Sequence, residues 1–175
     1  IAAQGHKEMF SGDGFPDVSK VASINAYLGA FPVARALQEG ADIVITGRSV
    51  DSAVTLGACI DAFGWGRGDL NQLAMGSLAG HILECGPQAT GGNFTDWELS
   101  NNLENIGYPV AEIRQDGSFL CSKPKGTGGL VSVGTIAEQM VYEIGDPQAY
   151  ILPDVICDFS EVELTQIGKD LVEVK

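Results

Sequence analysis

A short run of β-branched residues between two helical patterns constrains the fold of this chain most. Residues 41–46 read ADIVIT and are followed by Gly47. An unbroken apolar run with turn residues at its ends is typical of a strand buried in a parallel sheet. Apolar residues at helical spacing precede it at about 32–39 and follow it at about 50–63. We therefore expect 41–46 to be an interior parallel strand, with both helices packed on its sheet.

The rest of the chain predicts further helices and hairpins, and residues 1–20 form a leader without periodicity. Helices are expected at about 70–85 and 133–144, hairpins at 110–124 and 162–174, and a strand at 154–159. Length and the absence of a linker indicate a single α/β domain over residues 1–175. We predict a mixed sheet with at least one parallel βα unit plus hairpins, and helices packed on the sheet.

Charge and cysteine spacing exclude several functional classes. Ten basic and 23 acidic residues give a net charge of −13, which argues against nucleic acid as a partner. No apolar stretch approaches the ~20 residues of a membrane span, so we expect no membrane partner. The cysteines are single and widely spaced, without a C-x-x-C pair, which predicts free thiols, no metal site and a cytoplasmic location. They are Cys59, Cys85, Cys121 and Cys157.

A glycine-rich loop with two lysines is the first candidate site. Residues 123–129 read KPKGTGG and precede a helical pattern, and backbone N–H groups at a helix N-terminus bind anions. The known phosphate-loop formulas do not fit, so a structural turn remains the alternative. The helix could begin at Thr127, or later at the capping box Thr135–Glu138. The candidate ligand-binding residues are Lys123, Lys125, Gly126, Thr127, Gly128 and Gly129.

A second Thr-Gly-Gly follows the helix expected at 70–85. Thr90, Gly91 and Gly92 are its residues, and we expect this loop to meet the first one at a single mouth. Upstream, His81 and Glu84 share a helix face with Cys85 and could act as a general acid or base. Metal binding and a packed core histidine are the alternatives.

The segment after the predicted strand supplies a third candidate. Arg48 and Asp51 follow 41–46, and ligands bind at the carboxyl ends of strands in open α/β sheets. Both would then point into a crevice and hold a ligand near the Thr-Gly-Gly loops. An ordinary surface pair, or Asp51 as a residue of the first helical turn, is the alternative.

Several of these stretches together resemble the acyclic terpene utilisation A family. They are NAYLGAFPVARALQEGADIVITGRSVDSA, LAMGSLAGHILECGPQATGGNF, GYPVAEIRQDGSFLCSKPKGTGGLVSV and YEIGDPQAYILPDV. The resemblance runs from about residue 22 to the end. Members of that family are much longer than 175 residues, so it implies an internal portion of a longer protein.

The resemblance implies a role in the breakdown of citronellol- and geraniol-type isoprenoids, whose intermediates are methyl-branched acyl-CoA thioesters. We expect an enzyme of lyase, hydratase or hydrolase type, with His81 or Glu84 moving the proton and with Arg48, Lys123 and Lys125 holding anionic groups. No separate cofactor is expected beyond the CoA thioester as substrate, and a homo-oligomer is expected. The alternative is a non-catalytic binding or assembly subunit that handles acyl-CoA.

Overall fold

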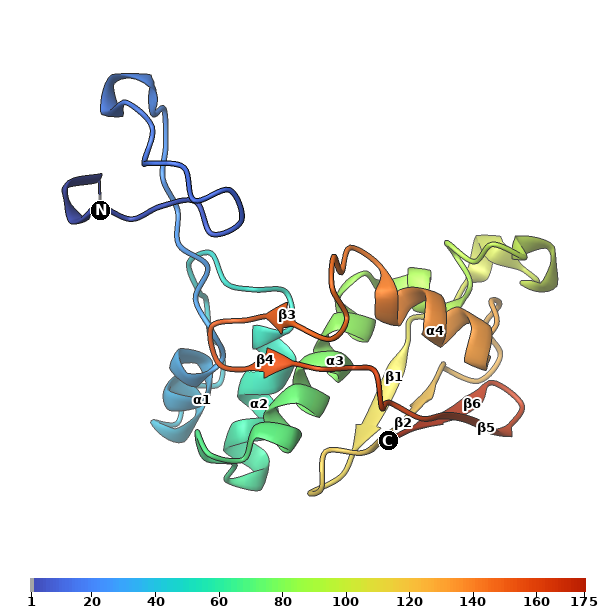
Figure 1. Cartoon of the computed structure of the whole chain (residues 1–175). Helices are drawn as coiled ribbons and strands as arrows, with labels where there is room; N and C mark the ends of the chain where they lie inside the picture. Colours follow the sequence, from blue (N-terminus) through green and yellow to red (C-terminus); the bar gives the residue numbers. More distant parts are fainter. Residues whose placement is uncertain (1) are drawn as a thin grey trace.

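The computed structural model describes residues 2–175, which form a mixed α/β structure (Figure 1). Four α-helices are present among these residues, and the sheets contain antiparallel pairs. The helices are α1 (Phe31–Gln38), α2 (Ala53–Phe63), α3 (Leu70–Glu84) and α4 (Val133–Val141). The strands are β1 (Val110–Ile113), β2 (Phe119–Ser122), β3 (Tyr150–Ile151), β4 (Ile156–Cys157), β5 (Leu164–Gly168) and β6 (Leu171–Val174).

The main sheet has the strand order β1-β2-β6-β5, and β3 and β4 form a separate two-stranded sheet. Both predicted hairpins are confirmed. Gly117, with φ of +91°, follows Asp116 in the turn between β1 and β2, while Asp170 adopts φ of +52° between β5 and β6. The helix α3 packs on β1 and α4 packs on β5, as expected for helices that pack on the sheet. The two helices that were expected to pack on the sheet around 41–46 do not do so: α1 packs on α2, and α2 packs on α3.

The core lies between α2, α3, α4 and the sheet. Its most deeply buried large side chains come from all of these elements, because each presents one apolar face to the others. The helix α3 is buried on several sides, and Gly80 allows close packing there because a Cβ would lie 2.7 Å from the backbone of Ser52. The largest fully buried hydrophobic side chains include Leu56, Ile60, Leu73, Leu78, Ile82, Phe119, Ile136, Val172 and Val174.

The predicted parallel strand at 41–46 is wrong. These residues form an extended loop without strand pairing, and Ile43 and Ile45 are 82% and 93% exposed. The four strands of the main sheet all come from residues after 109, so no strand lies beside this segment to complete a ladder. The parallel βα unit is therefore not formed, although an isolated parallel bridge joins Leu28 to Ser49.

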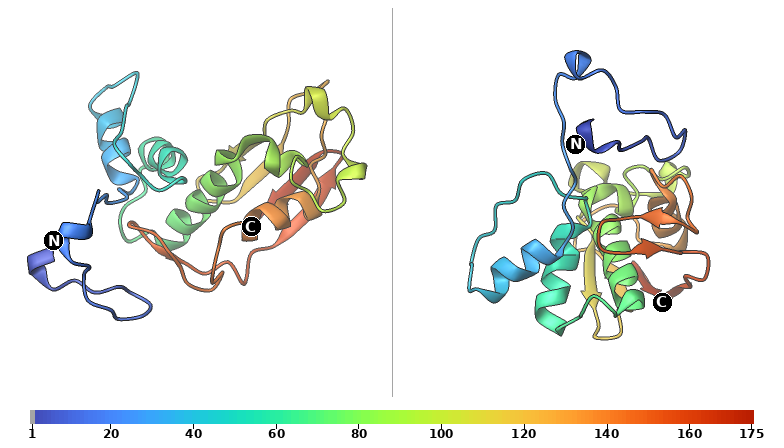
Figure 2. Two further views of the ribbon diagram at one scale, coloured as in Figure 1. Left: turned by 90° about the horizontal axis from the view of Figure 1, so that it is seen from above. Right: turned by 60° about the vertical axis from the view of Figure 1, so that its left-hand side comes forward.

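Other differences concern the limits of elements. The helix expected at 50–63 begins at Ala53, and the strand expected at 154–159 is confined to β4. The helix expected to extend to 144 ends at Val141. The leader has two short 3₁₀ turns, Ala2–Gln4 and Val18–Lys20, and projects away from the helices and sheet (Figure 2). Within residues 2–175, no helix combines the length and apolarity required to cross a bilayer.

Candidate functional site

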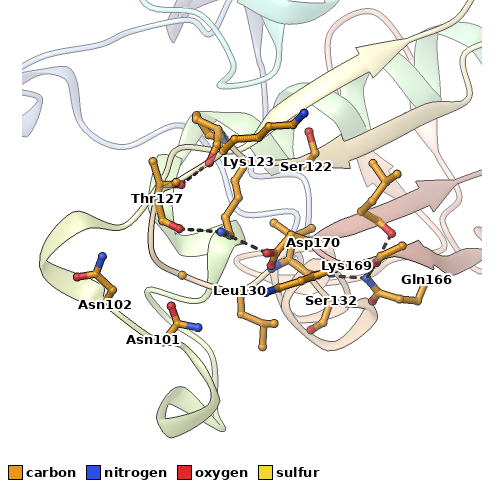
Figure 3. Close-up of a pocket in the computed structure, with 17 residues that line it drawn as sticks. Asn101, Asn102, Ser122, Lys123, Thr127, Leu130, Ser132, Gln166, Lys169 and Asp170 are labelled. Carbon is orange, nitrogen blue, oxygen red and sulfur yellow. Dashed lines mark hydrogen bonds and ion pairs between the residues drawn. The ribbon is translucent and has the colours of Figure 1, made fainter.

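The glycine-rich loop 123–129 lines an open pocket of about 980 Å³. One wall is the segment 122–132, which leads from β2 to α4. The facing wall is the β5–β6 turn, residues 166–171, and Asn101 and Asn102 complete the rim (Figure 3). Two chain segments about 40 residues apart in sequence thus enclose one volume.

Three of the ten basic residues of this acidic chain line the pocket: Lys123, Lys125 and Lys169. The Lys123 side chain is 8% exposed, and its ammonium group lies 3.4 Å from Asp170 Oδ2 and 3.0 Å from the carbonyl oxygen of Thr127 (Figure 3). Lys125 and Lys169 are exposed and make no ion pair within residues 2–175. Lys123 therefore joins the two walls, whereas Lys125 and Lys169 are free to meet an anion.

The N-terminus of α4 is capped by the protein's own side chains. Ser132 is the N-cap, and its Oγ accepts from Thr135 N while Thr135 Oγ1 accepts from Ser132 N. Gln166 Oε1 accepts from Val133 N, and Asp170 Oδ1 accepts from Val131 N. These N–H groups are therefore already satisfied, and an anion in the pocket would be held by side chains instead.

The capping box lies three residues earlier than the sequence pattern suggested. Thr135 is the partner of Ser132 and not the N-cap itself, and Thr127 does not cap the helix. Glu138, expected to close the box, accepts instead from the backbone N–H of Thr95. The sequence contained the signal in Ser132, three residues before Thr135.

The two Thr-Gly-Gly loops do meet. Leu130 N donates to the Thr90 carbonyl oxygen at 2.8 Å, and Thr90 Oγ1 donates to the Gly107 carbonyl oxygen at 2.6 Å. Gly128 N and Gly129 N donate to the backbone carbonyls of Asn105 and Asn101. The loops are thus joined through the segment 101–107, and their donors are used in that junction.

Glycine is required at this junction for steric reasons. A Cβ on Gly128 would overlap the Asn102 carbonyl oxygen, and Gly129 has φ of +86°. Gly91 has φ of +101°, and a Cβ there would overlap Ser100 Oγ. Thr90, Gly91 and Gly92 support the rim of the pocket from behind and do not line it, whereas Gly126, Thr127 and Gly129 line it directly.

His81 lies in α3, away from the lysine-lined pocket. It is 4% exposed, and its Nε2 lies 2.9 Å from the carbonyl oxygen of Gln139 in α4. Burial lowers the pKa of His81 below its usual value, although this hydrogen bond and the nearby carboxylates of Glu84, Asp51 and Glu143 oppose the shift. A neutral imidazole that joins two helices corresponds to the packed core histidine that the sequence left as an alternative.

Glu84 also lies outside the pocket, at the end of α3. The Cys85 thiol donates to Glu84 Oε1 at 2.6 Å, and burial together with this contact raises the pKa of Cys85 to about 11. A thiol with so high a pKa is a poor nucleophile at neutral pH. All four cysteines are free, and three are buried. Residues 2–175 contain no cluster of three or more His, Cys, Asp or Glu side chains able to hold a metal ion.

Arg48 and Asp51 lie before α2, also outside the pocket lining. The Arg48 guanidinium is 5.5 Å from the centre of the Tyr27 ring, and its Nη1 lies 3.4 Å from the Tyr27 hydroxyl. No ion pair joins Arg48 to Asp51 in the described part of the chain. The structure thus brings together the 123–129 loop and its supports, but leaves Arg48, Asp51, His81 and Glu84 elsewhere.

Several residues that line the pocket were not predicted as site residues. The sequence places Lys169 and Asp170 only within the hairpin expected at 162–174, and no motif marks Gln166 or Asn102. A signal existed in the clustering of scarce lysines at turns, because Lys169 and the 123–125 pair both follow strand patterns. Their proximity depends on β2 pairing with β6, which the sequence did not reveal.

Fold and site together define a mixed α/β protein with a lysine-lined pocket between a glycine-rich loop and a hairpin turn. A family model described as "Acyclic terpene utilisation family protein AtuA" matches residues 2–175, and the chain belongs to this family. The match confirms the resemblance and extends it over the leader. It assigns the chain a role in acyclic terpene utilisation. No curated protein and no solved structure matches the chain.

Proposed function

We propose that this chain binds a methyl-branched acyl-CoA intermediate of acyclic terpene breakdown and holds its nucleotide phosphates at the lysine-lined pocket. The observation that carries the proposal is the placement of three of ten basic side chains around one pocket in a chain of net charge −13. A protein with this charge repels anions elsewhere, so a local cationic site favours a specific anionic ligand. The proposal includes a cytoplasmic location, where acyl-CoA thioesters and free thiols are both expected.

Size and polarity support a nucleotide-sized ligand. The pocket volume of about 980 Å³ lies near the upper end of the range for small-molecule sites. Lys125 and Lys169 come from opposite walls of the pocket, and we expect a polyphosphate to contact both. Amide side chains of Asn101 and Asn102 add neutral polar groups on the rim.

Binding without catalysis is the second candidate, and the position of His81 favours it. His81 is buried and hydrogen-bonded between two helices, and neither it nor Glu84 lines the pocket. If the chain is an enzyme of lyase, hydratase or hydrolase type that uses His81 or Glu84, that group must reach the thioester from outside this lining. Incubation of the protein with a branched, unsaturated acyl-CoA, followed by mass spectrometry, separates the two. If the wild-type chain hydrates or cleaves the thioester or releases free CoA, and the His81→Gln and Glu84→Gln variants do not, catalysis is supported. If the thioester binds but remains unchanged, the second candidate is supported.

The ligand itself provides the test of phosphate recognition. Isothermal titration compares an acyl-CoA with the corresponding acyl-dephospho-CoA, which lacks the 3′-phosphate, and with the acyl-pantetheine thioester, which lacks the whole nucleotide. We expect affinity to fall at each step, and the affinity for acyl-CoA to fall as salt is raised. Equal affinity for acyl-CoA and acyl-pantetheine would contradict the proposal.

A further inference from the structure

The segment 42–47 combines the sequence of a strand with an exposed and unpaired backbone. Ile43, Val44, Ile45 and Thr46 are consecutive β-branched residues, the type most enriched in strands. Ile43 and Ile45 are 82% and 93% exposed, and in a paired strand two residues at this spacing point to the same face. Within residues 2–175, no backbone N–H or C=O group of 42–47 makes a hydrogen bond. An exposed apolar strand of this kind is a template for pairing with another chain.

The chain exposes more surface than a compact monomer of the same mass. Its accessible surface is 10196 Å², whereas a compact monomer of this mass exposes about 8,200 Å². The excess of about 2,000 Å² per chain exceeds the ~800 Å² that each partner buries in a stable interface of standard size. The leader and the loop before α2 stand out from the body in both views of Figure 2 and account for this shape.

Charge determines which side of this acidic molecule can approach a second copy. Residues 2–52 carry four basic and six acidic side chains, a net charge of −2, whereas residues 53–175 carry six basic and 17 acidic ones, a net charge of −11. Two copies would repel each other strongly through their bodies and weakly through their N-terminal regions. The exposed strand-forming segment therefore lies in the region where self-association meets the least electrostatic resistance.

We propose that segment 42–47 is a homodimer interface, in which it pairs antiparallel with the same segment of a second copy across a two-fold axis. The pairing satisfies the unpaired backbone groups and buries Ile43 and Ile45 of both copies. A two-fold interface uses the same patch on both subunits, so a single segment of this kind is sufficient. Tyr27, whose ring lies 5.5 Å from the guanidinium of Arg48 just after the segment, would extend the contact.

Light scattering coupled to size-exclusion chromatography tests this proposal. We expect a dimer for the wild-type chain and at least a hundredfold weaker association for Ile43→Asp/Ile45→Asp. The matched control is Ile156→Asp/Ile167→Asp, which changes two exposed isoleucines of the body, 65% and 48% exposed, and should leave the dimer intact. A monomeric wild-type chain, or a dimer that survives the Ile43/Ile45 change, would overturn the proposal.

A cysteine substitution tests directly whether the two copies of the segment lie close together. Ile45→Cys should give a disulfide-linked or short-crosslinker-linked dimer under mild oxidation, because the two-fold axis brings both copies of the segment together. Ile156→Cys, an exposed position on the body, should remain unlinked under the same conditions. Far-ultraviolet circular dichroism of each variant shows that the fold is retained. Linkage through position 156 but not through position 45 would place the interface elsewhere and overturn the proposal.

Discussion

Asp170 should be the residue on which the shape of the pocket depends most. Its Oδ1 accepts from Val131 N at 3.0 Å, and its Oδ2 lies 3.4 Å from Lys123 Nζ, so one carboxylate joins the hairpin turn to the facing loop. The Lys123 and Asp170 side chains are 8% and 20% exposed, and Val131 is fully buried. Asp170 also adopts φ of +52°, a conformation that Asp and Asn tolerate better than Ala.

The magnitude follows from these contacts. Removing one partner of a buried ion pair costs about 3–5 kcal/mol, and an orphaned buried N–H costs about 1–3 kcal/mol. The two costs overlap and water reaches the exposed fifth of the side chain, so we expect Asp170→Ala to lower the free energy of unfolding by about 3 kcal/mol. Asp170→Asn keeps an acceptor for Val131 and tolerates the backbone conformation, so its cost should be about 1.5 kcal/mol.

Urea unfolding at pH 7 measures both values, and thermal unfolding should show a fall of about 6–12 °C for Asp170→Ala. Lys123→Met combined with Asp170→Asn completes a double-mutant cycle, in which we expect a coupling energy of about 1 kcal/mol. Asp61→Ala, at an exposed position of α2, serves as the control and should change stability by less than about 0.5 kcal/mol. A value for Asp170→Ala within about 0.5 kcal/mol of wild type, or zero coupling, would refute the reasoning.

Three further outcomes are expected. Gly128→Ala forces a Cβ into a backbone carbonyl and should cost about 2–3 kcal/mol in urea unfolding, whereas Gly68→Ala, which has open space around its Cβ, should cost far less. Because burial lowers the pKa of His81 in the folded state, its stabilising contribution is complete above the unfolded value of about 6.5 and is lost as pH falls through the folded pKa. The stability advantage of wild type over His81→Gln should therefore shrink between pH 7.5 and 5.5, and a constant advantage would contradict the assignment. In thiol titration, the denatured, unreduced chain should give four free thiols, and fewer than four free thiols would indicate a disulfide. The native chain should react first at Cys85, because the other three cysteines are buried.

Local signals in the sequence predicted the hairpins and most helices, because their causes are local. Asp116-Gly117 supplies the positive φ of a tight turn, and the apolar stripe of α4 requires a single buried face. The repeated Thr-Gly-Gly also pointed to a real junction, since glycine is needed where two backbones approach closely.

Features that depend on distant segments could not be predicted in this way. The run 41–46 has the composition of a buried strand, but composition does not supply the neighbouring strand that a ladder needs. Lys169 lies in the site because β6 pairs with β2, and Lys123 forms an ion pair with Asp170. His81 matched both a catalytic and a core pattern, and its surroundings in the fold correspond to the core pattern.

The central claim is that the free lysines of the pocket bind the phosphates of an acyl-CoA, and titration of one double variant tests it most directly. Lys125→Ala/Lys169→Ala leaves the Lys123–Asp170 pair in place, so it changes the ligand contacts and spares the junction between the walls. Lys7→Ala/Lys20→Ala removes the same charge from the leader and is the control. Calorimetry should give at least a tenfold higher Kd for the pocket variant and a weaker dependence of its Kd on salt, with the control close to wild type. A tenfold change corresponds to about 1.4 kcal/mol, which is comparable to the contribution of one charge-assisted hydrogen bond. An unchanged Kd in the pocket variant, or an equal loss in both variants, would contradict the account.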